Sequence, residues 1–302
     1  MSPQDASMNK KTFIRAVEYW VPDASGSLLE FGGGLFGAAK RFEAATRNLC
    51  FGRGEGLPGQ AWEQGHPLML KDLQSPLFRR AAAALADGLT CAVALPVFVG
   101  ERLSTVVLLF CSGDADLAGA IELWHNDPAD NSDMTLQSGH YGNTGDTFEF
   151  LSSHTSFRCG TGLPGLAWDK QAPVFMPDLG RGSGFLRADS ALKVGINRGF
   201  AMPCGSVDDH VYVLAFLSAL ATPIASQVDV WQPDALQSHL VHSFSFSETP
   251  SETTPRPEHN LALNDGVVGS VFATGVPVQD GQRIVCPVAM QDHITAVMAL
   301  SL

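Results

Sequence analysis

The chain contains one sequence pattern three times, and this repetition constrains its fold more than any other feature. The segment GEGLPGQAWEQGHPLMLKDL, which starts at Gly54, matches GTGLPGLAWDKQAPVFMPDL, which starts at Gly160, at the glycines, Leu-Pro-Gly, Ala-Trp, a proline and Asp-Leu. A third copy, NDGVVGSVFATGVPVQDG, starts at Asn264 and has Phe272 where the other copies have tryptophan. Repetition of this kind indicates a series of similar structural units.

Two further landmarks flank each copy in the same order. A segment of alternating apolar and polar residues precedes each copy, and its three forms are AVEYWVPD, AIELWHND and QVDVWQPD. Two β-rich runs follow each copy and indicate a hairpin, with the turns at Gly100-Glu101, Asp208-Asp209 and Gln291-Asp292. A repeat of roughly 100 residues suits a small domain and is too long for a solenoid unit. We therefore predict consecutive domains over residues 12–115, 116–222 and 223–302.

Each unit is predicted to have the element order β-β-α-β-α-β-β. This order makes an α+β fold, with an antiparallel sheet and helices packed mainly against one of its faces. In the first copy, Pro58 is expected near the start of a short helix that stops at Gly65, and a brief strand follows over residues 68–70. Ser75 is expected to cap a second, alanine-rich helix that ends near Gly88.

The order of these motifs resembles the GAF domain family. The resemblance rests on Gly-x-Gly-Leu-Pro-Gly-x-Ala-Trp, the short strand ending in Asp-Leu, the helical cover and the Pro-Val hairpin. The VExWxPD opening is similar to the first strand of GAF domains in bacterial sensor proteins. Together these features cover most of residues 16–218 and, more weakly, residues 227–302. The resemblance implies a cytosolic signalling module that binds a small molecule or mediates dimerisation. Because no output domain is recognised, we expect a non-catalytic sensing protein that acts on a separate output protein.

In a GAF fold the cover closes a ligand pocket on the sheet, so the residues in and near it are the ligand-binding candidates. An arginine there could clamp an anionic group, although a solvated helix face is the alternative. A tryptophan could line the pocket or fill the core, and an aspartate could hold a ligand donor or cap the next segment. The candidates are Trp62, Asp72, Phe78, Arg79, Trp168, Asp178, Phe185, Arg187 and Arg198.

Two other functions are compatible with the same fold. A dimerisation or scaffold protein would have filled cores, with the aromatic candidates interlocked and no cavity. A GAF-type methionine sulfoxide reductase would need a reactive cysteine beside the pocket. Cys91, Cys159 and Cys204 are conceivable for that role, but the cysteine pattern of that family is not reproduced.

The third copy lacks the segment that would form the cover. A helix-length segment separates Asp72 from Pro96 in the first copy, and an equally long one is present in the second. In the third copy, only residues 281–286 stand between Asp280 and Pro287, which is too short a segment for the cover. We therefore expect the first two units to be competent for ligand binding, and the third to be a structural cap or a docking surface.

Composition excludes several classes of partner. A net charge of −12, from 31 acidic and 19 basic residues, argues against binding nucleic acid or an anionic membrane. The histidines and cysteines show no metal-ligand spacing, so neither a metal nor a cofactor is expected. The chain has no recognisable secretory signal, and its longest apolar run is too short to span a bilayer. We expect a cytoplasmic protein with reduced thiols, and a homodimer is possible.

Overall fold

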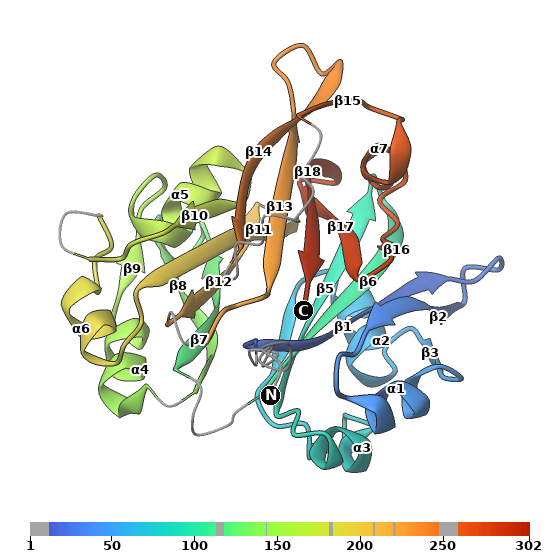
Figure 1. The fold of residues 1–302 in the computed structure, drawn as a ribbon, viewed down its shortest axis with the longest axis horizontal. Helices are drawn as coiled ribbons and strands as arrows, with labels where there is room; N and C mark the ends of the chain where they lie inside the picture. The colour runs from blue at the N-terminus through green and yellow to red at the C-terminus, as the bar shows by residue number, and fades with distance from the viewer. Residues whose placement is uncertain are drawn as a thin grey trace, which may run out of the picture.

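The first third of the chain forms one α+β unit, here called unit 1 (Figure 1). The computed structural model describes residues 12–112, 118–142, 144–180, 184–207, 209–219, 222–247 and 259–302. In unit 1 the elements are β1 (Ile14–Pro22), β2 (Leu28–Leu35), α1 (Lys40–Thr46), β3 (Cys50–Gly52), α2 (Gly56–Gln64), β4 (Leu68–Leu70), α3 (Ala81–Ala86), β5 (Cys91–Val99) and β6 (Arg102–Cys111).

Units 2 and 3 repeat this architecture. The elements of unit 2 are β7 (Gly119–Asn126), β8 (Met134–Tyr141), α4 (Gly145–Ser153), β9 (Ser156–Phe157), α5 (Gly162–Lys170), β10 (Val174–Met176), α6 (Ala188–Lys193), β11 (Arg198–Val207) and β12 (His210–Ser218). The elements of unit 3 are β13 (Gln227–Pro233), β14 (His239–Ser247), β15 (Asn260–Ala262), α7 (Gly266–Thr274), β16 (Val278–Asp280), β17 (Arg283–Met290) and β18 (His293–Ser301).

All three sheets are antiparallel, have six strands and share one strand order. In unit 1 the order is β3-β2-β1-β6-β5-β4, and the equivalent strands follow the same order in units 2 and 3. The first and last strands of each unit are therefore neighbours at the centre of the sheet, and the hairpin landmark supplies the last two strands. The predicted fold class of three consecutive antiparallel sheets with packed helices is confirmed. Residue Asp208 of the second predicted turn lies outside the described residues.

Local signals explain several element boundaries, and one expected boundary is wrong. Gly65 ends α2 in the left-handed conformation, with φ of 72°, as a glycine after a helix does. Ser75 does not cap the covering helix, because α3 begins only at Ala81. The preceding residues turn so that Phe78 and Arg80 point into unit 1, where both are buried. The segment that was expected to form the first turns of the helix is therefore non-helical, and it buries these two side chains instead.

The structure adds elements that the predicted order lacks. In units 1 and 2 a short helix, α1 or α4, follows the second strand and leads into a very short third strand. In unit 3 only Gly281 and Gln282 separate β16 from β17, so no covering helix stands between these strands. No helix within the described ranges is both long enough and apolar enough to cross a membrane.

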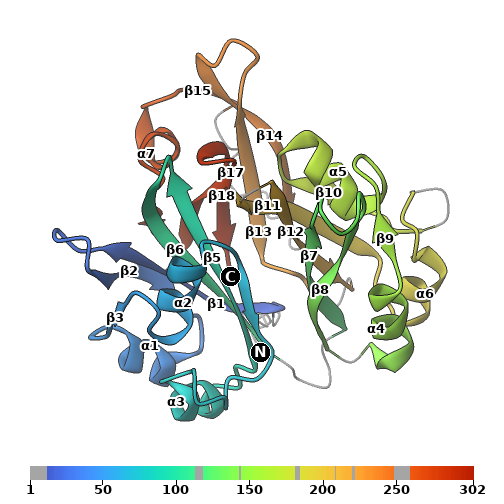
Figure 2. The ribbon, with the colours of Figure 1, turned by 180° about the vertical axis from the view of Figure 1, so that it is seen from behind.

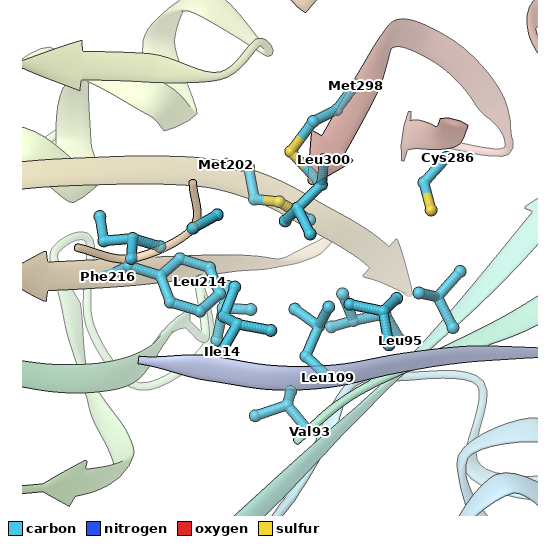
Figure 3. Packing of buried hydrophobic residues seen from close by; sticks show 14 of the residues in the cluster. Ile14, Val93, Leu95, Leu109, Met202, Leu214, Phe216, Cys286, Met298 and Leu300 are labelled. Carbon is cyan, nitrogen blue, oxygen red and sulfur yellow. The ribbon is translucent and has the colours of Figure 1, made fainter. Parts of the chain in front are cut away.

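The three sheets pack against one another through the faces that carry no helices (Figures 1 and 2). Successive side chains of a strand point to opposite faces. In β1, Ala16 and Trp20 face the helices of unit 1, whereas Val17 and Tyr19 face the other units. Figure 3 shows the apolar residues that fill this shared core, among them Ile14, Leu109, Met202, Phe216, Cys286 and Leu300. Each sheet is thus buried on both faces.

Equivalent strands of the three units meet at the centre of the shared core. The hairpin prolines Pro96, Pro203 and Pro287, from β5, β11 and β17, line one apolar cavity of about 20 Å³. A cavity of this size has room for about one water molecule. Backbone hydrogen bonds from Phe13 N to Pro223 O (2.7 Å) and from Ile14 N to Ile224 O (3.0 Å) also join the start of β1 to the segment that enters β13.

A stack of four rings joins units 1 and 2. The ring of His66 lies on Tyr212, with 5.3 Å between the centroids. The ring of His125 also stacks on Tyr212, with 4.5 Å between the centroids, and His210 stacks on His125 at 5.0 Å. His125 Nε2 and His210 Nδ1 are 2.8 Å apart, which is hydrogen-bonding distance. Burial and the nearby His210 lower the pKa of His125, and Asp127 opposes them.

We expect the stability of the protein to fall as the pH drops from about 7 to about 5. A lowered pKa in the folded state means that the unfolded chain binds the proton of His125 more readily. The contribution of His125 is therefore complete above its ordinary pKa of about 6.5 and is lost below it. Urea unfolding across this pH range should show a shallower slope for His125→Gln than for the parent. An unchanged slope would contradict the prediction. Some slope should remain, because burial also lowers the pKa of His140 and His242.

Candidate functional site

The first strands of units 1 and 2 place a carboxylate and a tryptophan on the face covered by helices. Glu18 and Trp20 alternate with core-facing residues in β1, and Glu122 and Trp124 occupy the same places in β7. The indole Nε1–H of Trp20 donates to Glu18 at 2.9 Å, and that of Trp124 donates to Glu122 at 3.1 Å. Both carboxylates are fully buried, so each needs further partners.

A β-bulge occurs at the same point of the first strand in every unit. The register shifts between Tyr19 and Trp20 in unit 1, between Leu123 and Trp124 in unit 2, and at Trp231 in unit 3. A bulge increases the local twist of a strand and changes the direction of the side chains beside it. The bulge and the tryptophan together are therefore a repeated structural feature of the covered face.

In unit 1 an arginine from the cover reaches the buried carboxylate. Arg80, the residue before α3, donates from both terminal nitrogens to the two oxygens of Glu18, each at 2.6 Å. The same guanidinium donates to Thr46 Oγ1 of α1 at 2.6 Å. The side chains of Arg80 and Glu18 are only 3% and 0% exposed. This pair fastens the cover, the sheet and α1 to one another.

Unit 2 contains an equivalent arrangement. Arg187, the residue before α6, donates to Glu122 at 2.5 and 2.8 Å, and also donates to Ser152 of α4. Tyr141 Oη adds a hydrogen bond to Glu122 at 3.1 Å. Burial alone would raise the pKa of Glu122, but the charge of Arg187 and the hydrogen bonds to the carboxylate hold it below its ordinary value. Glu122 is therefore ionised and paired.

Four aromatic rings surround each buried guanidinium. The distances from Arg80 Cζ to the ring centroids of Phe42, Phe78, Phe110 and Trp20 are 4.4, 5.1, 5.5 and 5.7 Å. Around Arg187, the rings of Phe185, Phe148, Trp124 and Phe157 lie at 5.1–5.8 Å. A cation over aromatic faces is attracted by their quadrupoles, and more strongly where water is excluded. Arginine and aromatic rings thus fill the space between sheet and cover in both units.

Among its described residues, unit 3 has the acid but neither the cover nor an equivalent arginine. Asp229 of β13 precedes Trp231 in the same spacing, and it is 3% exposed. Its carboxylate accepts hydrogen bonds from Ser245 Oγ at 2.7 Å and from Gln227 Nε2 at 2.8 Å. His242 Nε2 lies 3.9 Å from the same carboxylate. Short polar side chains of the sheet therefore replace the arginine where no cover is present.

The sequence-based candidates separate into three groups in the structure. Phe78, Phe185 and Arg187 lie in the covered cores, and Trp62 and Trp168 are partly buried against the same cores. Arg79, Asp72 and Asp178 are exposed and lie outside them. Arg79 makes an ion pair with Glu55, and the two aspartates accept backbone hydrogen bonds from Gln74 and Gly180. Arg198 is half-buried at the start of β11.

The sequence reasoning missed the partners of the arginines. Glu18 and Glu122 form a repeated Glu-x-Trp within the first landmark, but the alternation of that landmark predicts only a strand. Arg80 and Arg187 were visible as a repeated Phe-x-Arg in the cover. An acid and a base that recur in the same two copies indicate an ion pair. Within the described residues, no group of three or more His, Cys, Asp and Glu side chains could hold a metal ion.

The chain is similar in fold to solved structures that contain GAF domains. No model of a known protein family matches the sequence, and no curated protein is similar enough to match. The GAF domain of nlh2 from A. aeolicus, in an inactive state, is 16% identical, covers 33% of this chain and 58% of its own, and has a TM-score of 0.27.

Two further matches have similar values. A free methionine-R-sulfoxide reductase from Neisseria meningitidis, in complex with its substrate, is 17% identical over 32% of this chain and 52% of its own, with a TM-score of 0.26. The NreA protein from Staphylococcus aureus, mutated in its nitrate-binding site, is 15% identical over 33% of this chain and 75% of its own, with a TM-score of 0.27. Each match covers about the share of the chain that one unit occupies, and less than two thirds of the first two structures.

Proposed function

We propose that the chain is a non-catalytic scaffold of three GAF-like units, in which the first two units have filled cores. The observation that carries this proposal is the occupation of both covered faces by the protein's own side chains. In unit 1, Arg80 and Glu18 take up the space between cover and sheet, and in unit 2 Arg187 and Glu122 do the same. A ligand would have to displace a buried ion pair and the rings packed around it, which is costly.

A ligand screen with a built-in positive control tests this proposal. Trp20 and Trp124 lie in the two cores, so their fluorescence reports on occupancy. We expect no change with nucleotides, amino acids or aromatic metabolites. Phe78→Ala should create a cavity in unit 1 that admits indole, because apolar cavities of this kind bind small aromatic molecules. A saturable change in the parent protein would refute the filled-core proposal if it is abolished when both members of one buried pair, Arg80 with Glu18 or Arg187 with Glu122, are replaced with leucine.

One observation favours the alternative, in which unit 2 senses a small molecule and passes the signal to a separate protein. Arg187 Nε is buried and has no hydrogen-bond partner among the described residues, and Thr144 Oγ1 of the same unit is also buried without one. Buried polar atoms of this kind are usually satisfied by a water or a ligand. In the screen, a response of Trp124 that Arg187→Leu removes would favour this alternative.

The environment of the thiols supports a non-catalytic protein. Cys91, Cys111, Cys204 and Cys286 are buried. Burial raises the pKa of Cys91 and Cys286 to about 12, and it also raises the pKa of Cys204. A reactive cysteine needs the opposite, because the thiolate is the nucleophile. The buried thiols therefore suit core packing.

We expect two thiols to react in the folded protein and four to react only after unfolding. Cys50 and Cys159 are exposed. Partial burial and the neighbouring Asp169 raise the pKa of Cys159, so less of it is thiolate at pH 8. Asp169→Asn should speed its reaction with an aromatic disulfide by roughly two- to fivefold, because removing a nearby negative charge lowers a thiol pKa. Cys50 in the same variant is the control, and an equal acceleration there would contradict the explanation.

A further inference from the structure

The three units are arranged in a cycle, and the same two elements meet at each junction. The C-terminal end of the helix that follows the Gly-rich turn in one unit faces the last hairpin of the next unit. In the first junction, His66 after α2 stacks on Tyr212 of β12. In the junction between units 3 and 1, Ser104 Oγ of β6 donates to Thr274 O at the end of α7, at 2.8 Å. Both junctions are closed by direct contact.

The third junction, between units 2 and 3, contains a cleft. Thr295 of β18 is equivalent to Ser104 of β6, because the strand register skips both residues at the bulge of the last hairpin. Lys170 and Gln171 at the end of α5 line the cleft together with Thr295, and its volume is about 470 Å³. Small-molecule sites are typically clefts of about 300–1,000 Å³. The cleft therefore has the size of a ligand site at the point where pseudo-symmetry would place a contact.

Two glutamines in this cleft have a backbone conformation that favours glycine. Gln171 ends α5 with φ of 49°, whereas the equivalent residues of α2 and α7 are Gly65 and Gly275, with φ of 72° and 68°. Gln237 in the turn after β13 also has φ of 49°, and its equivalent in unit 1 is Gly26, with φ of 70°. A side chain is strained in this region, and such strain clusters at functional sites. Units 2 and 3 therefore each have a glutamine at a position where unit 1 has a glycine, which adopts this conformation without strain.

The cleft is lined by both polar and apolar side chains, and Lys170 is the cation among them. Lys170 and His293 line it, and no carboxylate is among the lining residues, although the chain carries a net charge of −12. Gln232 Oε1 accepts a hydrogen bond from Ser243 at 2.7 Å, so its amide N–H groups remain to donate. Lys170, Gln171 and Gln237 have no side-chain hydrogen bond to other described residues. Phe272 supplies an apolar wall.

Asp234 and Asp169 lie next to the cleft, and their carboxylates accept hydrogen bonds from groups outside it. The carboxylate of Asp234 accepts hydrogen bonds from the backbone N–H groups of Ser238 and His239 within its own turn. Asp169 accepts a hydrogen bond from the thiol of Cys159 and is not among the lining residues. Each of these carboxylates therefore has donors of its own, and Lys170 is the charged side chain that lines the cleft.

We propose that this cleft between units 2 and 3 binds a small organic anion, a carboxylate with an apolar group that lies against Phe272. Lys170 supplies the charge, and the amides of Gln171, Gln232 and Gln237 donate to the oxygens of the anion. The site lies between units and outside both covered cores, so it goes beyond the proposed scaffold function and does not depend on whether those cores are filled.

Titration of the full chain with matched probes tests this site. Benzoate has the carboxylate and the apolar ring, benzamide keeps the shape without the charge, and inorganic phosphate has a charge without the ring. We expect benzoate to shift the side-chain amide resonances of the three glutamines saturably, with a Kd in about the millimolar range for so small a ligand. Benzamide and phosphate should bind at least about tenfold more weakly, because each lacks one of the two groups that the cleft recognises.

Glycine variants separate binding from folding. Gln171→Gly with Gln237→Gly restores the residues of the sister units, so the double variant should fold and have an unchanged or higher Tm. It should bind benzoate about tenfold more weakly, because two donors are lost. Gln291→Gly is the control, since Gln291 also has a positive φ of 47° but does not line this cleft. It should leave binding unchanged.

Three outcomes would overturn the proposal. One is the absence of any saturable shift with benzoate. Another is equal binding of benzamide and benzoate, which would exclude an anion site. The third is undiminished binding to the double glycine variant or to Lys170→Met, which would place the ligand elsewhere.

Discussion

Replacing Arg80 with alanine is expected to lower the free energy of unfolding by about 3–5 kcal/mol. The substitution leaves the carboxylate of Glu18 buried without its bidentate partner, and it removes a cation that four aromatic rings surround. It also frees the cover from the sheet, so the amides of α3 should exchange faster with solvent than those of α6 in unit 2. Urea unfolding and hydrogen exchange measure the two effects.

The adjacent arginine provides a matched control. Arg79 is exposed and pairs with Glu55 at the surface, where an ion pair contributes about 0–1 kcal/mol. Arg79→Ala should therefore change the stability little. Replacing both Arg80 and Glu18 with leucine should cost less than Arg80→Ala alone, because no unpaired charge stays buried. Equal losses for Arg79→Ala and Arg80→Ala would contradict the role assigned to the buried pair.

The second large effect is expected at Leu109, in the core that the three sheets share. Leu109→Ala should lower the free energy of unfolding by about 2–5 kcal/mol, because it removes buried apolar contacts and leaves a cavity. Leu109 is 2% exposed and packs with residues of all three sheets (Figure 3). The loss should therefore spread beyond unit 1, and hydrogen exchange should quicken in β11 and β17 as well as in β6.

Leu108→Ala is the matched control for this effect. Leu108 is the preceding residue of the same strand and is also buried, but it faces the helices of unit 1. Its loss should be similar in size, with the faster exchange centred on α2 and β1. If Leu108→Ala and Leu109→Ala gave the same exchange pattern, the three units would unfold as one body and the shared core would have no separate effect.

Local patterns predicted most of the secondary structure and missed the shortest elements. The strand Leu68–Leu70 and the turn at Gly65 were predicted because they carry a local signal, an apolar run or a helix-ending glycine. The three-residue strand β3 has too few residues to show alternation. Helix α1 is one of several short helices that need tertiary packing to be stable, here through buried Phe42.

The candidate site could be predicted only in part. The sequence pointed to the covers and to their aromatic residues, and Phe78, Phe185 and Arg187 do lie in the covered cores. It could not tell which of two adjacent arginines points inward, because that depends on where α3 begins. The helix begins at Ala81, and this places Arg80 against Glu18 and leaves Arg79 in solvent.

The three similar α+β units, and the missing cover of the third, follow from the order and spacing of motifs along the chain. Both conclusions rest on spacing along the chain, which local interactions impose in each copy separately. The shared core of the three sheets, the two junctions closed by contact and the cleft at the third become visible only in the folded chain. Contacts between units join residues that are far apart in the sequence, and no periodic pattern records which apolar face meets which.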